Sequence, residues 1–555
     1  MRLLKCSFLC AETRRASLIH LPPKNFSDLS WRSRFVENFP GDPESGNFVR
    51  QVENVAYSEV RPTPVQEPAL LGWSQALAGE LGIRRPGATD SLSLELLAGN
   101  RTLPTMRPYS ARYGGHQFGQ WAGQLGDGRA ITLGEADFGE NGYFEFQLKG
   151  AGPTPYSRRA DGRAVLRSSM REFLCSEAMH ALGVPTTRAL SLVATGDTVV
   201  RDMFYDGHPK AEPGAIVCRV APSFLRFGNF EILAAQGEHA LLEKLARSLI
   251  VDQYTELDPR DPDAIGNLLD GICRRTAVMI AQWMRVGFVH GVMNTDNMSA
   301  LGLTIDYGPY GWLEPYDPDW TPNTTDAQGR RYRYGHQPTV ALWNLARLGE
   351  SFFPLLGNEE RIHRSLTIYR DTFEKTHSRM LAQKLGLASL DALENQALVQ
   401  DLFQLLHASE TDLTIFFRNL CDLRVDSDQT RPGDDTVFLS LLSPALYGTE
   451  TLEGSLRERW VAWSGRYAAT LRQEGSKDEV RSRIMKQVNP KYVLRNYLAQ
   501  NAINAAERGD LSIMERLMRV LQSPYDDLAG DDDLAAKRPE WARSAPGCSA
   551  LSCSS

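Results

Sequence analysis

Three oxygen-bearing side chains near the middle of the chain have the types and spacing needed for chemistry on a nucleoside triphosphate. Asp296 and Asn297 are adjacent, and Asp306 follows directly after the apolar run 301–305. A divalent cation that bridges phosphates takes hard oxygen ligands, so Asn297 and Asp306 predict a Mg²⁺ or Mn²⁺ site with ATP as co-substrate. Asp296 is then placed to act as the general base for an attacking hydroxyl. The alternatives are a loop turn at 294–297, a helix cap at Asp306, and a structural or metal-binding role for Asp296.

The same stretch keeps part of a motif pair found in protein kinases. Kinases carry H-R-D-L-x-x-x-N followed by D-F-G, in which the last Asn and the second Asp hold the metal. His290 and Asn297 keep the seven-residue spacing, and D-Y-G at 306–308 stands in place of D-F-G. Gly291 and Val292 replace the Arg and the base Asp. The metal pair is kept while the usual base is missing, which predicts ATP chemistry other than ordinary phosphorylation, with His290 orienting the loop.

A lysine and a glutamate earlier in the chain extend this kinase-like set. Lys149 lies at the end of a predicted strand, and Glu172 follows 23 residues later in a predicted helix. In kinases such a lysine holds phosphates and pairs with a glutamate of the following helix. We therefore expect Lys149 to contact the nucleotide and Glu172 to form the supporting ion pair. A solvated lysine and an unrelated surface glutamate are the alternative, because the spacing alone is weak evidence.

Two glycine-containing loops and two arginines could add phosphate contacts. Gly-Asp-Gly-Arg at 126–129 precedes a predicted strand, and Asp-Gly-Arg at 161–163 precedes the predicted helix. Glycines let backbone N–H groups approach phosphate, but Asp-Gly is also a strong hairpin signal, and the local sequence at 126–129 favours such a turn. Arg219 and Arg226 bracket an apolar segment. Arginine suits bidentate phosphate recognition and equally well forms structural ion pairs.

The pattern of apolar residues predicts a strand-rich first part and a helix-rich second part. Strands are expected at 130–133, 143–148, 190–200 and 215–220, with a helix at 166–182. Helices are expected at 240–252, 263–286, 341–348, 361–383, 398–407 and 493–508. This order predicts an α+β fold with two lobes and a nucleotide between them.

Composition limits the classes of protein to which the chain can belong. Its 555 residues carry a formal net charge of −7, which argues against nucleic-acid binding through bulk charge. No apolar run reaches the roughly 18 residues of a membrane-spanning helix, so we expect no membrane association. The eight cysteines are scattered and form no C-x-x-C pair, which fits a reducing compartment better than a disulfide scaffold or a zinc site.

The two ends of the chain differ from the rest in composition. Residues 1–28 are basic and poor in acids, which is typical of a mitochondrial transit peptide; an unstructured extension or an upstream start codon in a bacterial gene would give the same pattern. The expected compartment is cytoplasmic if the protein is bacterial and mitochondrial if it is eukaryotic. From about residue 523, clustered aspartates are followed by Pro, Ser and Cys, and we expect a poorly ordered, acidic tail over 523–555.

Long strings of residues, in order, resemble the selenoprotein O family of kinase-like proteins. The matching strings are Y-G-G-H-Q-F-G-Q-W-A-G-Q-L-G-D-G-R at 113–129, L-K-G-A-G at 148–152, T-P-Y-S at 154–157, D-G-R-A-V-L-R-S-S at 161–169, R-E-F-L-C-S-E at 171–177, and the loop from His290 through D-Y-G-P at 306–309. The resemblance covers roughly residues 50–520. It implies a protein-kinase-like two-lobed fold with a strand-rich N-lobe at 29–225, a helical C-lobe at 226–522 and family-specific extensions.

The resemblance also implies an activity and roles for individual residues. The resemblance implies a kinase-like fold that transfers AMP rather than phosphate from ATP to Ser, Thr or Tyr hydroxyls of proteins. It also implies that ATP binds flipped, so that its α-phosphate meets the nucleophile. Extra arginines would then neutralise phosphates that lie away from their usual place. Glu172 would orient Lys149, Asp296 would be the base, and Asn297 with Asp306 would hold Mg²⁺. By motif, the nucleotide would contact Gly126, Gly128, Arg129, Lys149, Asp161, Gly162, Arg219, Arg226 and Asp306.

The end of the chain departs from the family pattern in one respect. Animal members carry a selenocysteine near the C-terminus, where this chain has Cys553. Some bacterial members are thought to pair the C-terminal cysteine with one that follows the D-Y-G motif, but the segment 320–325 contains none here. Cys273 and Cys548 are the remaining candidate partners, so a redox role for Cys553 is an open hypothesis.

Four functions are open on the sequence. The first is a protein adenylyltransferase, and the second is a protein uridylyltransferase that uses UTP and Mn²⁺, because the same phosphate contacts would serve both. The third is a true kinase with Asp296 as a displaced base. The fourth is a non-catalytic nucleotide-binding scaffold, against which the complete set of Lys149, Asn297 and Asp306 argues. The expected partners are a nucleotide and a protein substrate, without nucleic acid or membrane.

Overall fold

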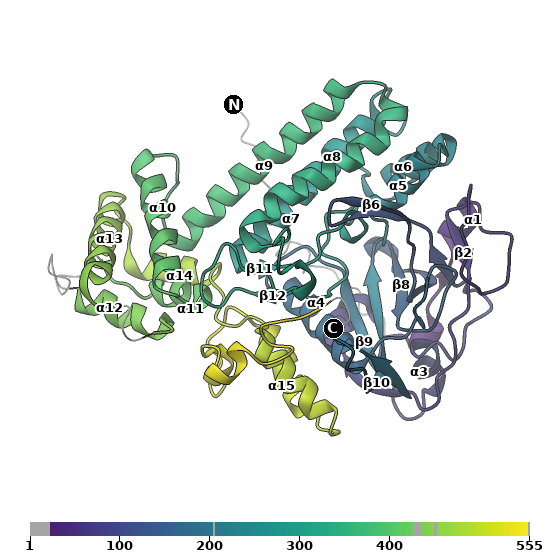
Figure 1. Cartoon of the computed structure of the whole chain (residues 1–555), viewed down its shortest axis with the longest axis horizontal. Coiled ribbons are helices and arrows are strands. Elements are labelled where there is room, and N and C mark those ends of the chain that lie inside the picture. Colours follow the sequence, from purple (N-terminus) through teal and green to yellow (C-terminus); the bar gives the residue numbers. More distant parts are fainter. Residues whose placement is uncertain (1–22, 204–205, 426–434, 449–451, 553–555) are drawn as a thin grey trace.

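The computed structural model describes residues 23–203, 206–425, 435–448 and 452–552. The longer strands gather in the first part of the chain, and the long helices form the second part (Figure 1). This arrangement is compatible with the predicted α+β class. Within the described ranges, no helix is long and apolar enough to cross a membrane.

An antiparallel sheet of eight strands forms the frame of the first part. The strand order is β2-β4-β7-β8-β10-β9-β3, and β1 pairs with β7. The central strand β8 ends at Lys149, which lies opposite Ala130 of β7 and Val217 of β10. The sheet register therefore places the lysine between two neighbouring strands. The strands are β1 (Trp31–Arg32), β2 (Tyr57–Glu59), β3 (Ala69–Trp73), β4 (Tyr109–Ala111), β7 (Ala130–Asp137), β8 (Tyr143–Lys149), β9 (Arg188–Arg201) and β10 (Lys210–Ala221).

Both faces of the sheet are covered, because alternate residues of its strands enter two different cores. On β10, Ala215 and Val217 pack in one core, while Ile216 and Cys218 pack in the other. The first core contains α4 and continues into the helices of the second part. The second core is closed by α2 and α3. The helices of this part are α1 (Arg34–Asn38), α2 (Gln75–Leu81), α3 (Ser91–Leu97) and α4 (Leu166–Ala181).

Long helices build the second part of the molecule. Helices α7, α8 and α9 lie side by side, and α10 to α14 form a group at one end of the molecule (Figure 1). Trp460 and Trp463 are fully buried in the core of that group. The helices are α5 (Phe227–Ala235), α6 (His239–Gln253), α7 (Ala264–Val286), α8 (Gln337–Leu356), α9 (Glu359–Leu385), α10 (Leu393–Ala408), α11 (Leu413–Leu420), α12 (Thr436–Leu442), α13 (Gly454–Gln473), α14 (Asp478–Lys486), α15 (Asn496–Ala506) and α16 (Ser512–Leu521).

The end of α7 begins the loop that carries the predicted catalytic residues. Gly287 ends the helix in the left-handed region with φ +74°, and a Cβ there would lie 2.9 Å from a methyl group of Leu413. The short strands β11 (Phe288–Val289) and β12 (Gly311–Trp312) then pair antiparallel. This pairing closes the loop 290–310 at its base, so that its two halves lie near each other.

Most elements predicted from the apolar pattern are present, with different ends. The predicted strands correspond to β7, β8, β9 and β10, and the helix at 166–182 corresponds to α4; the later helices correspond to α6, α7, α8, α9, α10 and α15. The apolar run 301–305, which precedes Asp306, does not form a strand. The run forms a turn and one isolated bridge between Thr304 and Thr186. Gly302 turns the chain at φ +67°, which leaves too few extended residues for a ladder.

Part of the predicted N-terminal extension belongs to the folded body. Residues 1–22 lie outside the described residues. Phe26, which falls within the predicted extension 1–28, has no exposed surface and makes edge contacts with Trp31 and Phe146. An aromatic cluster of this kind orders the chain from at least this point.

The expectation of a poorly ordered tail is wrong for residues 523–552. This segment contains two short 3₁₀ helices, η9 (Asp532–Ala535) and η10 (Glu540–Arg543). Leu534 of η9 is buried in the same core as α15 and α16. Ion pairs neutralise much of the acidic charge that suggested disorder: Asp531 Oδ1 lies 2.8 Å from Arg516 and Asp531 Oδ2 lies 2.9 Å from Arg519. Neutralised charge and a few buried apolar side chains therefore hold the tail in place.

Candidate active site

A cavity of about 640 Å³ lies where the sheet meets the loop 290–310. It collects residues from the glycine-containing loops, the central strands and the loop 290–310, which is called the catalytic loop because it carries the predicted base Asp296. A second cavity of about 680 Å³ lies between the end of α11 and α14, and it contains none of the predicted site residues. The predicted residues on the wall of the first cavity are Gly126, Gly128, Arg129, Lys149, Asp161, Gly162, Arg219, Asp296, Asn297 and Asp306.

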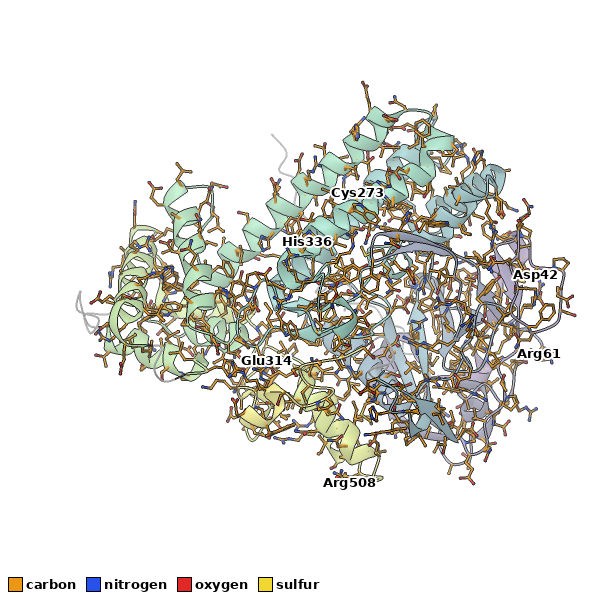
Figure 2. The ribbon with its side chains drawn as sticks, in the orientation of Figure 1. Asp42, Arg61, Cys273, Glu314, His336 and Arg508 are labelled. Carbon is orange, nitrogen blue, oxygen red and sulfur yellow. The ribbon has the colours of Figure 1, made fainter. Side chains whose placement is uncertain are left out.

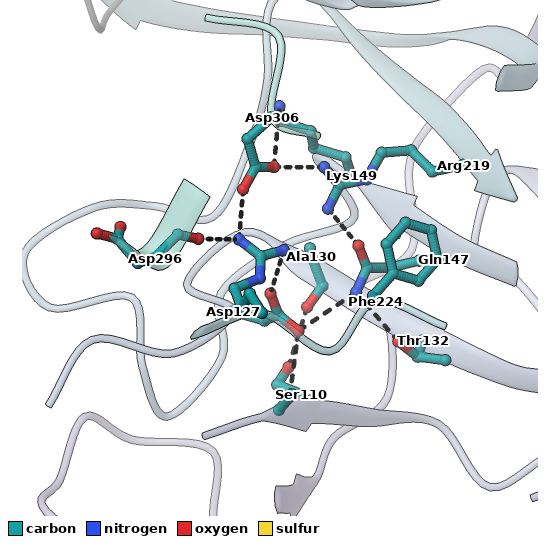
Figure 3. Close-up of polar contacts among 12 residues, drawn as sticks. Ser110, Asp127, Ala130, Thr132, Gln147, Lys149, Arg219, Phe224, Asp296 and Asp306 are labelled. Carbon is teal, nitrogen blue, oxygen red and sulfur yellow. Dashed lines mark hydrogen bonds and ion pairs between the residues drawn. The ribbon is translucent and has the colours of Figure 1, made fainter. Parts of the chain in front are cut away.

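Asp306 is the centre of a cluster of cations at the cavity wall. Its Oδ1 accepts a hydrogen bond of 2.5 Å from Arg219 Nη1, and its Oδ2 accepts one from Arg226 Nη1 (Figure 3). Lys149 Nζ lies 4.0 Å from Oδ1. Burial alone would raise the pKa of Asp306, but Arg226 and Arg219 outweigh it and hold the pKa well below its usual value. The carboxylate is therefore charged, and it shares its three cationic neighbours with the nearby acids Glu172 and Asp127.

Lys149 and Glu172 are joined as the helix spacing predicts. Lys149 Nζ lies 2.5 Å from Glu172 Oε2, and Arg219 Nη1 lies 3.3 Å from Glu172 Oε1. Burial lowers the pKa of Lys149, and the charge of Glu172 works in the opposite direction. Glu172 is 2% exposed and lies behind the cavity wall, so it holds both cations without reaching the cavity itself.

Two polar residues next to this cluster were not predicted from the sequence. Arg219 donates through Nη2 to Gln147 Oε1, and Gln147 Nε2 donates to Asp127 Oδ2 at 3.2 Å. Asp127 Oδ1 lies 3.8 Å from Arg226 Nη2, which closes the network (Figure 3). Gln147 lies directly opposite Arg219 in the pairing of β8 with β10. A correct strand register was the signal that could have found it, whereas Asp127 lies inside the predicted 126–129 loop.

Asp296 and Asn297 occupy a short 3₁₀ turn, η4 (Thr295–Asn297), on the other side of Asp306. The main-chain carbonyl of Asp296 accepts a 2.9 Å hydrogen bond from Arg226 Nη1, while its carboxylate points away from Asp306 (Figure 3). Burial raises the pKa of Asp296 to about 7. A carboxyl with a pKa near neutrality is suited to accept and release a proton.

Asn297 is fixed in a way that leaves its carbonyl oxygen available. Its Nδ2 donates to the main-chain carbonyl of Val292 at 3.0 Å, inside the same loop. The side-chain oxygen of Asn297 and the carboxylate of Asp306 are hard ligands on one cavity wall, and they fit a divalent cation. Among the described residues, no group of three or more His, Cys, Asp or Glu could hold a metal. A cation here would therefore take its other ligands from nucleotide phosphates and water.

The loop 126–129 is not the hairpin turn that its Asp-Gly pair suggests. It joins β6 (Gln120–Gln124) to β7, and these strands belong to different sheets. Gly126 has φ +91°, and a Cβ there would lie 2.4 Å from the ring of Tyr156. A Cβ on Gly128 would lie 2.8 Å from the Tyr156 carbonyl oxygen. Tertiary packing against the segment 154–157 therefore sets this conformation, and glycine is required at both positions.

Asp161 and Gly162 lie at the rim of the cavity. Asp161 pairs with Arg201 at 2.6 Å and accepts a 2.9 Å hydrogen bond from the backbone N–H of Arg163. Although burial opposes it, hydrogen bonding from Arg201 keeps the pKa of Asp161 below its usual value. A Cβ on Gly162 would lie 2.1 Å from the carbonyl oxygen of Gly152. The rim is thus a rigid loop that places an ionised carboxylate beside the cavity.

His290 has a structural place in the catalytic loop. Its ring Nε2 lies 2.9 Å from the carbonyl oxygen of Ile305, and the ring stacks on Trp283 with centroids 5.2 Å apart. Burial lowers the pKa of His290, so the ring is neutral. It joins the two ends of the loop, in agreement with the expectation that His290 orients it.

The structure describes two of the three cysteines in the redox hypothesis. Cys553 lies outside the described residues. Cys273 lies on α7 in the helical part (Figure 2) and has no exposed surface, and Cys548 is 4% exposed. Burial raises the pKa of Cys548 to about 11. Both candidate partners are therefore protonated and covered as the chain stands, which disfavours thiolate attack.

Comparison with known proteins shows the family to which the chain belongs. The sequence model of the family described as "Protein adenylyltransferase SelO" matches residues 46–522. A relative from Nitrosospira multiformis, named protein nucleotidyltransferase YdiU, is 56% identical over 560 residues, covering 98% of this chain and 99% of the relative. Relatives of the same name from Xanthomonas campestris and Rhodopirellula baltica are 55% and 52% identical, each over 95% of this chain and 99% of the relative.

These matches place the chain in the class of protein nucleotidyltransferases. It belongs to the SelO family of protein adenylyltransferases, which the resemblance in sequence predicted. The family description names adenylyl transfer, so the UTP alternative is not favoured.

Proposed function

We propose that this chain transfers AMP from ATP to Ser, Thr or Tyr hydroxyls of protein substrates. The observation that carries the proposal is the grouping of Lys149, Arg219 and Arg226 around the single carboxylate of Asp306. Glu172 balances part of this charge from behind the wall, while Lys149 and Arg219 line the cavity, where they can contact the phosphates of a nucleotide. The cavity beside this cluster also contains the proposed base Asp296 and the proposed metal ligand Asn297.

Nucleotide binding would redistribute the contacts of Asp306. Its two carboxylate oxygens are occupied by arginines, so a cation that binds Asp306 and Asn297 competes with them. The released guanidinium group of Arg219, which lines the cavity, can then form bidentate contacts with phosphate oxygens. The proposed Mg²⁺ or Mn²⁺ would neutralise phosphate charge when bound. Glu172 would keep Lys149 directed at the cavity throughout, since its contacts lie behind the wall.

The proposed transfer step follows from the placement of Asp296. The acceptor hydroxyl loses its proton to the Asp296 carboxylate while its oxygen forms a bond to the α-phosphorus of ATP. The bond from that phosphorus to the bridging oxygen of the β-phosphate breaks, and pyrophosphate leaves. A flipped nucleotide would bring the α-phosphorus to the acceptor, and the loops at 126–129 and 161–163 would contact the rest of the nucleotide. Burial of Asp296 supports the base role, because it keeps the pKa near the working pH.

The proposal includes a kinase-like division of the chain, with an N-lobe at 29–225 and a C-lobe at 226–522. Support comes from the sheet that precedes the helices and from the cavity that collects residues of both parts. The lysine on a central strand, the glutamate on the next helix and the Asn/Asp pair in a later loop follow the order of protein kinases.

Intact-mass measurement tests the proposal directly. The purified protein is incubated with ATP and Mg²⁺ or Mn²⁺, alone and with a generic protein acceptor, beside Asp306→Ala. Asp371→Ala on the exposed side of α9 serves as the matched control. An AMP-sized addition that Asp306→Ala loses and Asp371→Ala keeps is expected. A phosphate-sized addition would indicate a displaced-base kinase, and ATP binding without any addition would indicate a scaffold.

A further inference from the structure

A small hairpin covers the catalytic loop. It consists of β5 (Gly114–Gln117) and β6 (Gln120–Gln124), which pair only with each other among the described strands. The backbone N–H of His116 donates to Thr295 Oγ1 at 2.7 Å. The backbone N–H of Phe118 lies 3.2 Å from Asn294 Oδ1. The hairpin is therefore hydrogen-bonded to Asn294 and Thr295, the two residues that precede Asp296.

The anchor continues into the helical part of the molecule. Thr295 Oγ1 donates to Glu231 Oε2 on α5 at 2.6 Å, and Glu231 is 2% exposed. Tyr332 OH donates to Asn294 Oδ1 at 2.6 Å and accepts from the Phe118 N–H at 2.9 Å. Because these contacts are buried or partly buried, they hold the hairpin and the loop as one unit.

The two oxygens of the Asp296 carboxylate have different surroundings. A Cβ on Gly115 would lie 2.9 Å from Asp296 Oδ1 and 3.0 Å from Asp296 Cβ, so the hairpin backbone packs flat on the aspartate. Asp296 Oδ1 is buried and has no hydrogen-bond partner among the described residues. Asp296 Oδ2 accepts a 3.2 Å hydrogen bond from Gln117 Nε2. Because Oδ1 is covered, Oδ2 is the oxygen that a substrate can reach.

We propose that Gln117 is a positioning residue for the base, holding Asp296 so that Oδ2 faces the cavity and takes the proton of the acceptor hydroxyl. Gln117 and Asp296 line the same cavity. A carboxylate oxygen has more than one acceptor site, so the amide of Gln117 can occupy one while the hydroxyl occupies another. The absence of a side chain on Gly115 lets the hairpin close over Oδ1. This inference rests on the proposed transfer reaction, in which Asp296 is the base.

The chemistry explains why such a holder is needed. A general base works only within hydrogen-bond reach of the proton that it abstracts, and misplacement by about 1 Å can lower the rate by about 100-fold. Asp296 lies in a turn of three residues, and its carboxylate points away from the Asp306 cluster that would hold the nucleotide (Figure 3). The Gln117 amide is the side-chain donor that can fix that orientation.

The test compares Gln117→Leu and Gln117→Glu with Gln120→Leu, an exposed glutamine on the same hairpin. Ionised glutamate has the shape of glutamine but cannot donate a hydrogen bond, so it separates the hydrogen bond from packing. We expect both Gln117 variants to lower kcat for AMP incorporation into a generic acceptor by about ten- to 100-fold. KM for ATP and directly measured ATP binding should stay within about twofold, and Gln120→Leu should match the parent. Gly115→Ala, which pushes the hairpin off Asp296, should lower kcat in the same way.

Other results would overturn the inference. Parent-like kcat in Gln117→Leu and Gln117→Glu would show that the amide does not position the base. Equal losses of ATP affinity, melting temperature and kcat would show general damage to the hairpin. Failure of the proposed function gives a different result from either of these outcomes, because the parent protein itself would then transfer no AMP. If the parent transfers a different group, the same kcat comparison applies with that donor.

Discussion

Arg226 and Asp306 form an ion pair that joins a residue behind the cavity wall to a residue on that wall. Asp306 lines the cavity, whereas Arg226 is 2% exposed and does not. The same nitrogen of Arg226 that donates to Asp306 also donates to the carbonyl of Asp296. Arg226 therefore joins the proposed base and the proposed metal ligand through one guanidinium group.

Replacing this arginine should affect catalysis more than folding. Arg226→Lys keeps the charge, but a single ammonium cannot reproduce the planar contacts. We expect AMP incorporation to fall by about 100-fold, comparable to the loss of one preorganised donor, with the melting temperature lowered by only a few degrees. Arg247→Lys on the exposed side of α6 is the matched control. Activity within a few-fold of the parent would mean that Arg226 is not part of the site.

The glycine-containing loop gives a second prediction. Gly126→Ala places a methyl group 2.4 Å from the ring of Tyr156 at φ +91°, so the loop must move. We expect ATP affinity, measured by calorimetry, to fall by at least tenfold. Gly79→Ala is the control, because its Cβ meets nothing within 4 Å in α2. That change should leave ATP affinity unchanged and raise stability by up to about 1 kcal/mol. Unchanged affinity in Gly126→Ala would remove this loop from the nucleotide site.

Residue spacing within one loop was enough to predict part of the candidate site. The remaining contacts depend on strand register and tertiary packing. His290, Asn297 and Asp306 lie in one loop, so their order alone indicated their grouping. Gln147 meets Arg219 only because β8 and β10 pair in one register, which apolar alternation does not specify. Gln117 reaches Asp296 across 179 positions of sequence. Contacts of this range depend on tertiary packing, and no local pattern encodes them.

The prediction from composition that the tail is poorly ordered was wrong for a related physical reason. Clustered aspartates favour disorder when their charges repel one another and nothing compensates for them. Here Asp531 and Asp533 lie near Arg516, and Asp531 also pairs with Arg519 of α16. The basic partners stand in a helix earlier in the chain, so only the folded arrangement shows that the acidic charge is neutralised.

A buried lysine in α9 predicts how stability depends on pH. Burial lowers the pKa of Lys384 to about 7, and its ammonium lies 4.1 Å from the ring centroid of Phe417. Among the described residues it has no carboxylate ion pair. The unfolded chain keeps an ordinary lysine pKa of about 10.4, so between these two values the unfolded state binds more protons. Stability should therefore rise with pH from about 7 towards 10, as linkage requires.

Lys384→Met tests this sign. It should remove the pH dependence and raise the melting temperature, most clearly at about pH 7 and below, because each unit of pKa difference corresponds to about 1.4 kcal/mol. Lys375→Met, an exposed lysine on the same helix, is the matched control and should show neither effect. A melting temperature of Lys384→Met that follows the parent at every pH would contradict the buried, deprotonated state.

The C-terminal segment pairs with the chain that follows the D-Y-G motif, and this contact gives the last prediction. Leu551 is fully buried, donates to the Pro322 carbonyl at 2.9 Å and accepts from the Thr324 N–H at 2.8 Å. Between these residues, Asn323 Nδ2 donates to the carbonyl of Gly291 in the catalytic loop at 3.0 Å. The tail therefore supports the segment that holds the catalytic loop.

Removing residues 549–555 should loosen that support. The truncated chain would leave the Thr324 N–H and the Pro322 carbonyl without these partners, and a group that stays buried and unpaired costs about 1–3 kcal/mol. We expect a lower melting temperature, faster hydrogen exchange at 321–325 and at 290–297, and AMP incorporation reduced by about tenfold. Asn323→Ala removes the contact to Gly291 and the hydrogen bond that Asn323 Oδ1 accepts from the Thr325 N–H, but it keeps both backbone hydrogen bonds to Leu551. It should therefore slow AMP incorporation with a smaller change in melting temperature. If the truncation changes exchange at 321–325 but not at 290–297, the tail stabilises its own neighbours and has no influence on the catalytic loop.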